Sequence, residues 1–315
     1  MPDPRARDRD AFTLSGRPKG RIGFAVSGMK HYENRFYRNR PRSFAALSVT
    51  GSGCGRGCPH CGGLLLRSME DAGAAGAFRA RVDKAAEAGC SGILVSGGSG
   101  ADGAVPVLPA IRGIAYAKEK GLKVLVHTGL AGPETAFALK EAGADQVLPD
   151  LIGSDSAIRG VYGLEKSPED YRASLLACLD AGLAVAPHIV IGLDFGRIEG
   201  EYKAVDMAAE AGAERLILVV LTPQRGTAME GVTPPPLADV IRVIRYAADA
   251  LGGARVALGC ARPPACAAAL EIAAVDLGFH AIAYPHAETI RYAIGRGLEP
   301  VFFEECCSLA GDHLG

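Results

Sequence analysis

The sequence predicts an α/β fold, a parallel barrel of the (β/α)8 type. Eight short apolar runs alternate along the chain with eight longer, alanine-rich runs. The short runs are continuously apolar, as expected for parallel strands that are buried on both faces. Several of the longer runs end at an Ala-Gly pair, as at Gly89 and Gly143, where glycine stops a helix. A doubly wound open sheet is the alternative, but such a sheet usually shows fewer units.

The predicted elements divide the chain into three parts. Strands are expected at 44–50, 92–96, 123–127, 146–151, 184–191, 215–221, 255–260 and 281–284. Helices are expected at 73–88, 106–120, 133–142, 167–181, 200–211, 237–251, 264–277 and 288–296. We therefore expect an arm with a basic-aromatic segment at 1–42, the barrel at 43–297 and a cysteine-bearing tail at 298–315. In such a barrel, functional groups lie where the strands run into the loops that follow them.

Composition and charge narrow the class of protein. The 315 residues are 49% hydrophobic and 22% charged, which fits a globular protein with a large core. A net charge of -1 favours neither nucleic acid nor an acidic membrane surface as a partner. No apolar run reaches the roughly 18–20 residues that a membrane span needs, and residues 1–10 lack an apolar signal core. We expect a cytoplasmic location, where nine cysteines indicate metal or redox use more than disulfides.

The first 42 residues fall into two segments. Residues 1–20 mix charges of both signs with Pro and Gly and show no apolar period, so we expect a mobile arm. In residues 21–42, basic and aromatic side chains interleave: Lys30, His31, Arg35, Arg38, Arg40 and Arg42 with Tyr32, Phe36 and Tyr37. This segment either packs as a solvated stretch across one end of the fold, or docks an acidic partner protein or covers the active site.

Three cysteines lie on one glycine-rich loop, directly after the first predicted strand. Cys54, Cys58 and Cys61 have the spacing C-x3-C-x2-C. A closed structural zinc site takes four ligands, so zinc would need a fourth ligand elsewhere, such as His60. Three thiolates match a [4Fe-4S] cluster whose fourth iron is open, and soft thiolates suit iron–sulfur binding. We therefore expect an iron–sulfur cluster on this loop.

Polar or glycine-rich residues follow the next strands. Residues 96–100 read Ser-Gly-Gly-Ser-Gly, which forms either a plain turn or a place where backbone approaches a ligand closely. His127 is either a core residue or a polar group of the rim. Asp150 and Asp155 follow the fourth strand, and Asp155 is alternatively a helix cap. His188 lies within the fifth strand, either facing the barrel interior as a site residue or buried against a neighbour.

A second set of cysteines lies far along the chain. Cys260 and Arg262 share one face of the seventh strand by its two-residue period. Cys306 and Cys307 are adjacent in the tail, which is either a frayed end with spare thiols or a segment that folds back to bind a second cluster. Cys266 is a weaker candidate ligand. The remaining cysteines, Cys90 and Cys178, fall in or beside helical runs and are expected to be ordinary buried residues.

The cysteine loop after the first barrel strand resembles the signature of the radical S-adenosylmethionine (radical SAM) superfamily, over residues 43 to about 296. The resemblance implies that Cys54, Cys58 and Cys61 hold a [4Fe-4S] cluster whose open iron binds SAM. It also implies further cofactor-binding residues. These are His60 near the adenine, Gly97, Gly98 and Ser99 at the SAM amino group, Asp150 and Asp155 at the ribose or amino acid part, and Val190 in the adenine motif of the fifth strand.

Within the superfamily the chain is most similar to biotin synthase and its relatives. The turn at 222–227, Thr-Pro-Gln-Arg-Gly-Thr, and Arg262 match that group, in which the arginine sits beside an auxiliary iron–sulfur cluster. Cys260 and the tail cysteines depart from biotin synthase. Ordinary lipoyl synthase carries cysteines before the radical SAM motif, and this chain has none there. The combination resembles the biotin-synthase-related proteins that act as two-part lipoyl synthases, with Arg262 as a catalytic residue and Cys260, Cys306 and Cys307 as auxiliary-cluster ligands.

The resemblance implies reductive cleavage of SAM to a 5′-deoxyadenosyl radical and insertion of sulfur into an unactivated C–H bond of an octanoyl chain. Implied partners are an acyl-carrier or lipoyl-domain protein, a second radical SAM synthase, and an electron donor such as ferredoxin or flavodoxin. A different outcome, namely methylation, rearrangement or cofactor maturation, stays open. A non-enzymatic iron–sulfur or zinc carrier, or a redox sensor, is a further alternative.

Overall fold

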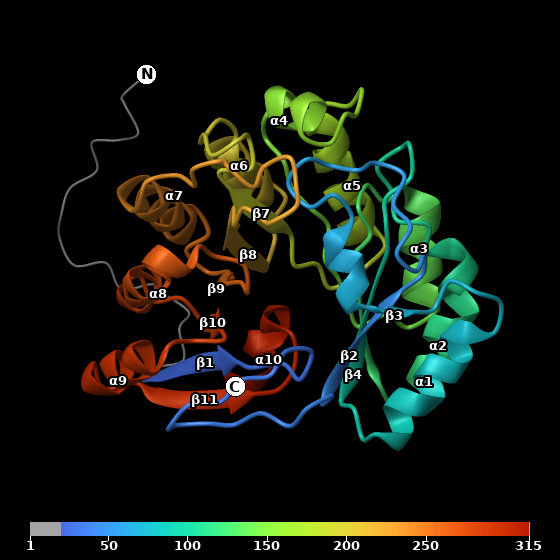
Figure 1. Cartoon of the computed structure of the whole chain (residues 1–315), viewed down its shortest axis with the longest axis horizontal. Helices are drawn as coiled ribbons and strands as arrows, with labels where there is room; N and C mark the ends of the chain where they lie inside the picture. The colour runs from blue at the N-terminus through green and yellow to red at the C-terminus, as the bar shows by residue number, and fades with distance from the viewer. Residues whose placement is uncertain (1–19, 315) are drawn as a thin grey trace.

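The computed structural model describes residues 20–314, in which strands and helices alternate along most of the chain (Figure 1). The strands are β1 (Arg21–Ala25), β2 (Phe44–Ser48), β3 (Glu70–Asp71), β4 (Gly92–Ser96), β5 (Lys123–Val126), β6 (Gln146–Val147), β7 (His188–Ile191), β8 (Arg215–Val220), β9 (Arg255–Leu258), β10 (Ala281–Ala283) and β11 (Glu299–Phe303). The helices are α1 (Ala77–Glu87), α2 (Ile111–Glu119), α3 (Pro133–Glu141), α4 (Asp155–Gly160), α5 (Pro168–Asp180), α6 (Glu201–Glu210), α7 (Leu237–Ala250), α8 (Ala267–Asp276), α9 (Ala287–Gly295) and α10 (Ala310–Leu314). Short 3-10 helices are η2 (Leu64–Ser68), η3 (Leu108–Ala110), η4 (Pro264–Cys266) and η5 (Cys307–Leu309). Each predicted strand contains an observed one, and each predicted helix overlaps an observed one.

The strands form two parallel sheets, which confirms the predicted α/β class. One sheet has the order β11-β1-β10-β9-β8-β7 and the other the order β3-β2-β4-β5-β6. Isolated parallel bridges join Val147 to Val185 and Asp150 to His188, so the two sheets meet between β6 and β7. The outer edges are β11 and β3. The closed barrel stays a prediction, while the parallel strands place their carboxyl ends at a common rim.

Strand β1 corrects the expectation for residues 21–42. We expected a surface segment there, but residues 21–25 form a strand between β10 and β11. Ile22 and Phe24 are fully buried in the hydrophobic core. The run is short and is followed at once by basic and aromatic residues, which hid its strand character in the sequence. The tail likewise contributes β11 to the sheet, and residues 1–19 of the predicted arm lie outside the described residues.

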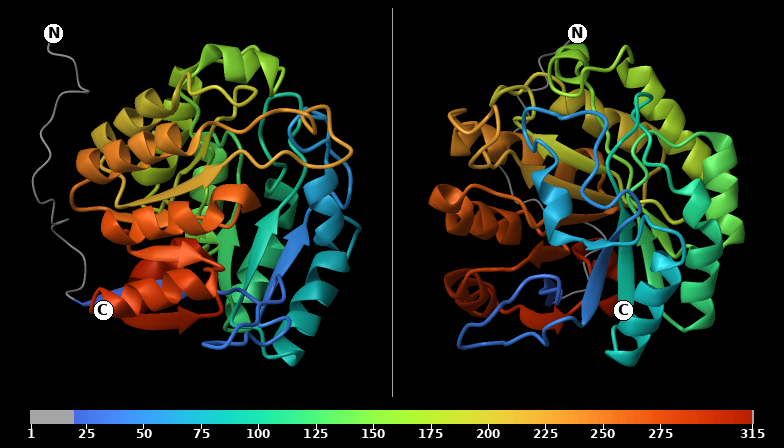
Figure 2. Two further views of the ribbon diagram at one scale, coloured as in Figure 1. Left: turned by 60° about the vertical axis from the view of Figure 1, so that its left-hand side comes forward. Right: turned by 45° about the vertical axis from the view of Figure 1, so that its right-hand side comes forward.

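The longer helices cover the outer side of the two sheets (Figure 2). Their apolar faces pack on the strands and build one extensive core. The glycines of the Ala-Gly pairs end four of these helices with positive φ angles, for example 69° at Gly89 and 78° at Gly143. Such angles are accessible to glycine at little cost, which confirms the predicted helix stops.

A second, smaller core lies on the inner side of the strands. Leu125, Leu148 and Ala186 project there from neighbouring strand segments, and they pack with Phe303 and Cys307 of the C-terminal residues. The two-residue period of a strand places every second side chain on this inner side. The inner core therefore shows which residues face the interior and that the chain's last segment lies against them.

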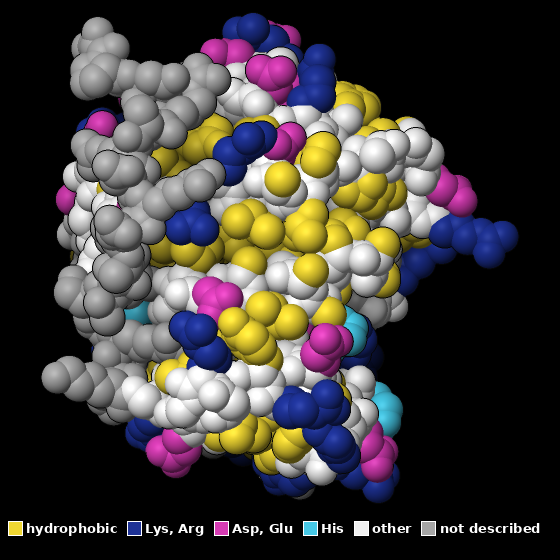
Figure 3. Space-filling view, turned by 90° about the vertical axis from the view of Figure 1, so that its left-hand side faces the viewer, with side chains coloured by type: hydrophobic (Ala, Val, Ile, Leu, Met, Phe, Trp, Pro, Cys, Tyr) yellow, Lys and Arg dark blue, Asp and Glu magenta, His cyan; other side chains and the backbone are white. Residues whose placement is uncertain are grey.

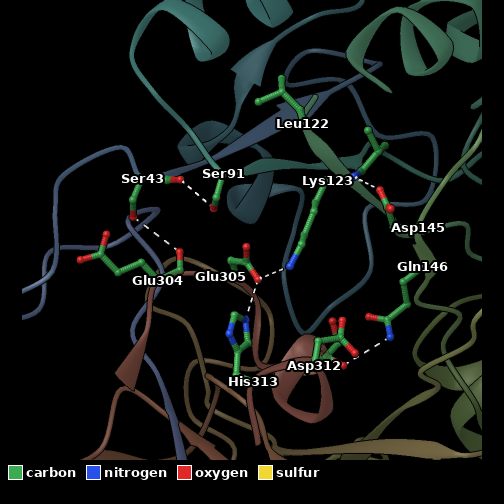
Figure 4. A network of polar contacts seen from close by, with 12 residues as sticks. Ser43, Ser91, Leu122, Lys123, Asp145, Gln146, Glu304, Glu305, Asp312 and His313 are labelled. Atoms are coloured by element: carbon green, nitrogen blue, oxygen red, sulfur yellow. Dashed lines mark hydrogen bonds and ion pairs between the residues drawn. The ribbon is translucent and has the colours of Figure 1, made fainter. Parts of the chain in front are cut away.

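The C-terminal segment crosses the amino-terminal ends of several strands (Figure 4). At the start of β5, Lys123 Nζ donates to Glu305 at 2.9 Å, and His313 Nε2 lies 2.7 Å from the same carboxylate. At the start of β6, Gln146 Nε2 donates to the Ser308 carbonyl at 3.3 Å. These contacts hold residues 304–314 over the end of the sheets that is opposite to the functional rim.

A search of the described helices for a long apolar membrane span finds none.

Candidate iron–sulfur and SAM site

The cysteine loop is folded by its own backbone at the carboxyl end of β2. The Cys58 carbonyl accepts hydrogen bonds from the N–H groups of Cys61 (3.1 Å) and Gly62 (2.7 Å). Cys58 is buried, whereas Cys54 and Cys61 are partly exposed. All three thiols are free. The predicted strand-then-loop placement of the three cysteines is therefore found in the structure.

The glycine-rich turn after β4 lies directly against the cysteine loop. The Gly98 N–H donates to Thr50 Oγ1 at 2.7 Å, and the Gly55 N–H donates to the Ser99 carbonyl at 3.2 Å. A Cβ atom on Gly98 would lie 2.2 Å from the Gly53 carbonyl oxygen and 2.5 Å from Cys54 Cα. The structure thus brings Gly97, Gly98 and Ser99 to the cysteines, and it shows why a side chain cannot replace Gly98.

Arg56 ties the same loop to the chain that follows α4. Its Nε donates to the Tyr162 carbonyl at 3.0 Å and its Nη2 to the carbonyls of Tyr162 and Gly163. On the other side, the Met229 N–H donates to the Pro59 carbonyl at 3.1 Å, where the loop before α7 passes the cysteine loop (Figure 2). These hydrogen bonds join segments that are far apart in the sequence, so no local pattern predicted them. They hold the cysteine loop from two sides.

The three thiols have different ionisation properties. Burial opposes ionisation of Cys54, but the N–H groups of Arg56, Gly57 and Ser99 outweigh it and lower the pKa of this thiol. Burial raises the pKa of Cys58 to about 12, and the neighbouring Cys61 and Cys54 thiolates add to the rise. Each thiol therefore lies within electrostatic reach of the others, and a bound cation would favour all three thiolates.

The donor set suits an iron–sulfur cluster. A closed structural zinc site takes four protein ligands, whereas each thiolate of a cubane cluster binds an iron of its own. Three soft thiolates on a glycine-rich loop, with a backbone cradle at Gly98, fit the predicted [4Fe-4S] cluster.

His60, Asp150 and Tyr162 lie beside the cysteine loop. The rings of His60 and Tyr162 are 5.5 Å apart between centroids. His60 Nδ1 is buried with no hydrogen-bond partner among the described residues, and burial lowers the pKa of His60 to about 4. Burial raises the pKa of Asp150 to about 6, and its charge raises the pKa of Cys61. The predicted site residues His60 and Asp150 are thus near the cysteines, and Tyr162 is a neighbour that the sequence analysis missed.

A small pocket, with a cavity volume of about 20 Å³, lies at the rim above β6 and β7. Its lining includes Asp150, Tyr162 and Val190. The buried Glu201 shapes the pocket, because its carboxylate accepts the N–H of Gly192 at 2.7 Å. Asp155 does not line the pocket but pairs with Arg159 on α4 at 3.8 Å, in an exposed position. The helix cap is instead Ser154, whose Oγ accepts the Ala157 N–H at 3.2 Å.

Two cysteines of the second set lie at the inner core, and the third lies at the end of β9. Cys307 is buried there, Cys306 is half-buried against it, and Cys260 is exposed at the end of β9. Desolvation and the nearby Cys306 thiolate raise the pKa of Cys260. A hydrogen bond from Cys307 lowers the pKa of Cys306 to about 7. The fold therefore brings tail and strand-end thiols within electrostatic reach, whereas Cys266 only donates to the Pro263 carbonyl at 3.6 Å.

Arg262 is buried and heavily engaged. Its Nε and Nη2 donate to Glu271 at 2.9 and 2.6 Å. Its Nη1 donates to the Gly259 carbonyl at 2.8 Å, and its Nη2 also reaches the Ala283 carbonyl at 2.7 Å. Glu271, which the sequence analysis missed, is fully buried. Arg262 thus joins β9, β10 and α8, and it lines a pocket together with Cys260.

The fold resembles solved enzyme structures, whereas no family model and no curated protein matches the chain. HydG, the FeFe-hydrogenase maturase from Carboxydothermus hydrogenoformans, is 15% identical with a TM-score of 0.59, covering 91% of this chain and 69% of that one. Streptococcus suis SuiB, solved with S-adenosylmethionine bound, is 16% identical with a TM-score of 0.52, covering 68% of this chain and 49% of that one. The chain therefore shares its fold with an FeFe-hydrogenase maturase and with a protein that was solved with S-adenosylmethionine bound.

The fold alone does not fix the chemistry. HMG-CoA lyase from Bacillus subtilis is 13% identical with a TM-score of 0.52, and the match covers 91% of this chain and 89% of that one. One fold can carry unrelated reactions through different loops. The cysteine loop and its surroundings must therefore carry the functional argument.

Proposed function

We propose that this protein is a radical SAM enzyme. The observation that carries the proposal is the C-x3-C-x2-C loop at the carboxyl end of β2, which is packed against the Gly98 turn. The resemblance of the cysteine motif and the shared fold are independent observations, and both support the proposal. The fold that the chain shares with HMG-CoA lyase does not by itself explain why this loop carries three free thiols.

The residues around the loop fit the two cofactors. Bound together, a [4Fe-4S] cluster and SAM supply a one-electron cleavage that yields the 5′-deoxyadenosyl radical. Cys54, Cys58 and Cys61 would hold the cluster. The backbone of residues 97–99 would face the SAM amino group, and Val190 would lie beside the adenine.

The chain's own residues shield the reaction from water. The tail covers the amino-terminal ends of the strands through Lys123 and Gln146, and the inner core fills that end of the interior. A carbon radical reacts with whatever is near it, so a closed interior prevents side reactions. The protein thus orients and encloses the reactants, while the cofactors carry the hard chemistry.

We further propose that the reaction inserts sulfur into an unactivated C–H bond of an octanoyl chain, in a lipoyl synthase of two proteins. Cys260, Cys306 and Cys307 would hold an auxiliary iron–sulfur cluster that supplies the sulfur. Arg262 would lie beside that cluster, since it lines the same pocket as Cys260. In the net change, SAM would take one electron from the reductant and break to methionine and the deoxyadenosyl group, which would leave with the hydrogen atom of the C–H bond. The carbon would form its C–S bond to a sulfide of the auxiliary cluster, and an iron of that cluster would take up the electron released.

The basic-aromatic segment supports an acidic carrier protein as partner. Of its exposed cations, Arg38 pairs with Glu33 and Arg40 with Glu304, whereas Lys30, Arg35 and Arg42 have no acidic partner within residues 20–314. Figure 3 shows basic side chains at the lower edge of the face that it displays. Unpaired surface cations favour encounter with an acidic surface. We also propose a reductant such as ferredoxin or flavodoxin as a partner that donates the electron for SAM cleavage.

An anaerobic turnover tests the proposed function. The reconstituted protein is incubated with SAM, dithionite and an octanoyl-lysyl peptide, with and without a partner lipoyl synthase component, and the peptide is analysed by mass spectrometry. We expect 5′-deoxyadenosine and a gain of sulfur mass on the peptide. If 5′-deoxyadenosine forms and the peptide stays unchanged in both mixtures, radical SAM chemistry stands and sulfur insertion is wrong. Maturation chemistry of the kind named for HydG is then the second candidate.

A further inference from the structure

Two histidines face the interior from neighbouring strand segments, and His188 also lines the small pocket beside Asp150 and Val190. His127 follows Leu125 by two residues, and His188 follows Ala186 by two, so both histidines lie on the side of the inner core. Their rings meet edge to face with 5.0 Å between centroids. The sequence left their role open, and the structure settles that they are a pair on the interior wall.

The pair lies between the two cysteine sets. On one side, the inner core beneath it contains Cys307, together with Leu148. On the other side, Asp150 follows Leu148 by two residues on the same face, pairs with His188 across the strands, and influences Cys61. The histidines therefore occupy the layer of the wall between the tail thiols and the cysteine loop.

The two rings are fixed as neutral hydrogen-bond acceptors. His127 Nδ1 lies 2.9 Å from the Leu148 carbonyl, and His188 Nδ1 lies 3.0 Å from the Ala186 carbonyl. A carbonyl only accepts, so each Nδ1 carries the proton and each Nε2 carries a lone pair. Burial lowers the pKa of His127 to about 4 and of His188 to about 3, so both rings are neutral near pH 7.

Both acceptors are available for a ligand. Neither Nε2 atom has a hydrogen-bond partner in the part of the chain that the structure describes, and neither is sealed off from solvent, because both residues are only partly buried. Flanking strands present apolar side chains beside them: Leu94 on β4 and Val219 on β8 are partly buried against the inner core. Two acceptors within an apolar wall suit a ligand with a donor group and an aliphatic part.

We propose that His127 and His188 form a substrate-binding site inside the fold and recognise an uncharged N–H or O–H donor, as in the amide that joins an acyl chain to its carrier. This inference deepens the proposed function and rests on it. Neutral acceptors disfavour a free carboxylate, which itself only accepts. The pair would thus select an acyl amide over the free fatty acid.

Calorimetric titration of the anaerobically reconstituted protein, with SAM present, tests the site through binding alone. The probes are an octanoyl-lysyl peptide and free octanoate. The variants are His127→Leu and His188→Leu, which remove the acceptor, and His188→Gln, which keeps one near the Nε2 position. Tyr292→Leu, which removes a ring from the outer helix α9, is the control.

We expect the native protein to bind the peptide more tightly than octanoate. Each Leu variant should raise the peptide Kd about tenfold, the size of one lost hydrogen bond, while His188→Gln stays within about threefold of the native value. Equal affinity of native and His188→Leu protein, equal weakening in the Gln and Leu variants, or preference for octanoate would overturn the assignment. A native protein that does not bind the peptide would also overturn the assignment of the histidine site. Formation of 5′-deoxyadenosine would then test the proposed radical SAM function separately.

Discussion

The two cysteine sets of this protein arise in different ways. Cys54, Cys58 and Cys61 share one loop, whose backbone hydrogen bonds and neighbouring Gly98 turn hold the thiols together. Cys260 meets Cys306 only because the C-terminal segment crosses the strand ends and packs on the inner core. The first set is therefore local and visible in the sequence, whereas the second depends on the whole fold. Substitutions that alter one cysteine set and leave the other intact therefore test whether each set holds a cluster.

The largest expected effect comes from Cys58→Ala. This buried thiol is the central one of the loop, and its loss leaves too few thiolates to hold the first cluster. We expect 5′-deoxyadenosine formation to fall below detection, measured by chromatography after incubation with SAM and dithionite. Cys90→Ala is the control, because that thiol only donates to the Arg42 carbonyl. Activity in Cys58→Ala equal to that of the control would contradict the assignment of the loop.

The double substitution Cys306→Ala/Cys307→Ala should remove only the second cluster. Two cubane clusters hold about eight irons per chain, so the variant should retain about four. The measurement is iron counting after anaerobic reconstitution, together with 5′-deoxyadenosine formation, which we expect to persist. A count of about four irons in both native and variant protein would show that the tail thiols hold no cluster.

Arg262→Ala should destabilise the fold near the second set. It leaves the fully buried Glu271 carboxylate without its guanidinium partner, and breaking such a buried pair costs about 3–5 kcal/mol of unfolding free energy. Denaturant unfolding of the cluster-free protein measures this loss. Arg225→Ala, on the rim loop before α7, is the control. A loss below about 1 kcal/mol would show that Arg262 has little structural role and would favour a purely catalytic one.

Gly98→Ala should perturb the first set through packing alone. The added Cβ would lie 2.2 Å from the Gly53 carbonyl, so the cysteine loop must shift, at a cost of about 1–3 kcal/mol. Gly132→Ala is the matched control, since a Cβ there meets no atom within 4 Å and its φ is -89°. We expect Gly98→Ala to bind less iron than the native protein, because the first set of thiols shifts while the tail thiols stay in place. Gly132→Ala should bind as much iron as the native protein. Equal iron binding in both variants would contradict the close fit of turn and loop.

The smallest effect concerns Glu305, which holds the tail over the strand ends. Burial opposes ionisation, but hydrogen bonds from His313 and Lys123 outweigh it and lower the pKa of Glu305. Because the folded pKa is the lower one, this stabilisation exists above about pH 4.5 and is lost as the pH falls through the depressed value. Glu305→Gln should therefore lower the unfolding free energy by about 1.5 kcal/mol at pH 7.

Unfolding curves at pH 7 and pH 3 measure the Glu305 contribution. We expect the difference between native protein and Glu305→Gln to be larger at pH 7 than at pH 3. Glu299→Gln, an exposed acid on β11, serves as the control. A difference of the same size at both pH values would show that the carboxylate's charge has no role in holding the tail.

Much of the fold was predictable, because the strands from Phe44 onward are short apolar runs between helices that end in Ala-Gly. The missed strand β1 has only five residues and adjoins a basic-aromatic stretch, so its burial depends on β10 and β11, which lie far away in sequence. A local pattern cannot show such pairing. The same reason explains why β11 was assigned to a tail.

The site divides in the same way. Spacing predicted the cysteine loop, and the glycines at 97 and 98 were predicted to form either a plain turn or a contact to a ligand; the structure places that turn against the cysteine loop. Arg56 at the Tyr162 carbonyl and Glu201 at the Gly192 N–H were not predictable, because each contact joins segments that only the fold brings together. Asp155 was predicted as a site residue, yet the structure places it on the exposed side of α4.

The most direct measurement is product analysis of the native, anaerobically reconstituted protein after incubation with SAM and dithionite. The account predicts 5′-deoxyadenosine and methionine in equal amounts, formed only by protein that contains iron. A protein that binds its iron fully and yields no 5′-deoxyadenosine would contradict the assignment of Cys54, Cys58 and Cys61 to a radical SAM cluster.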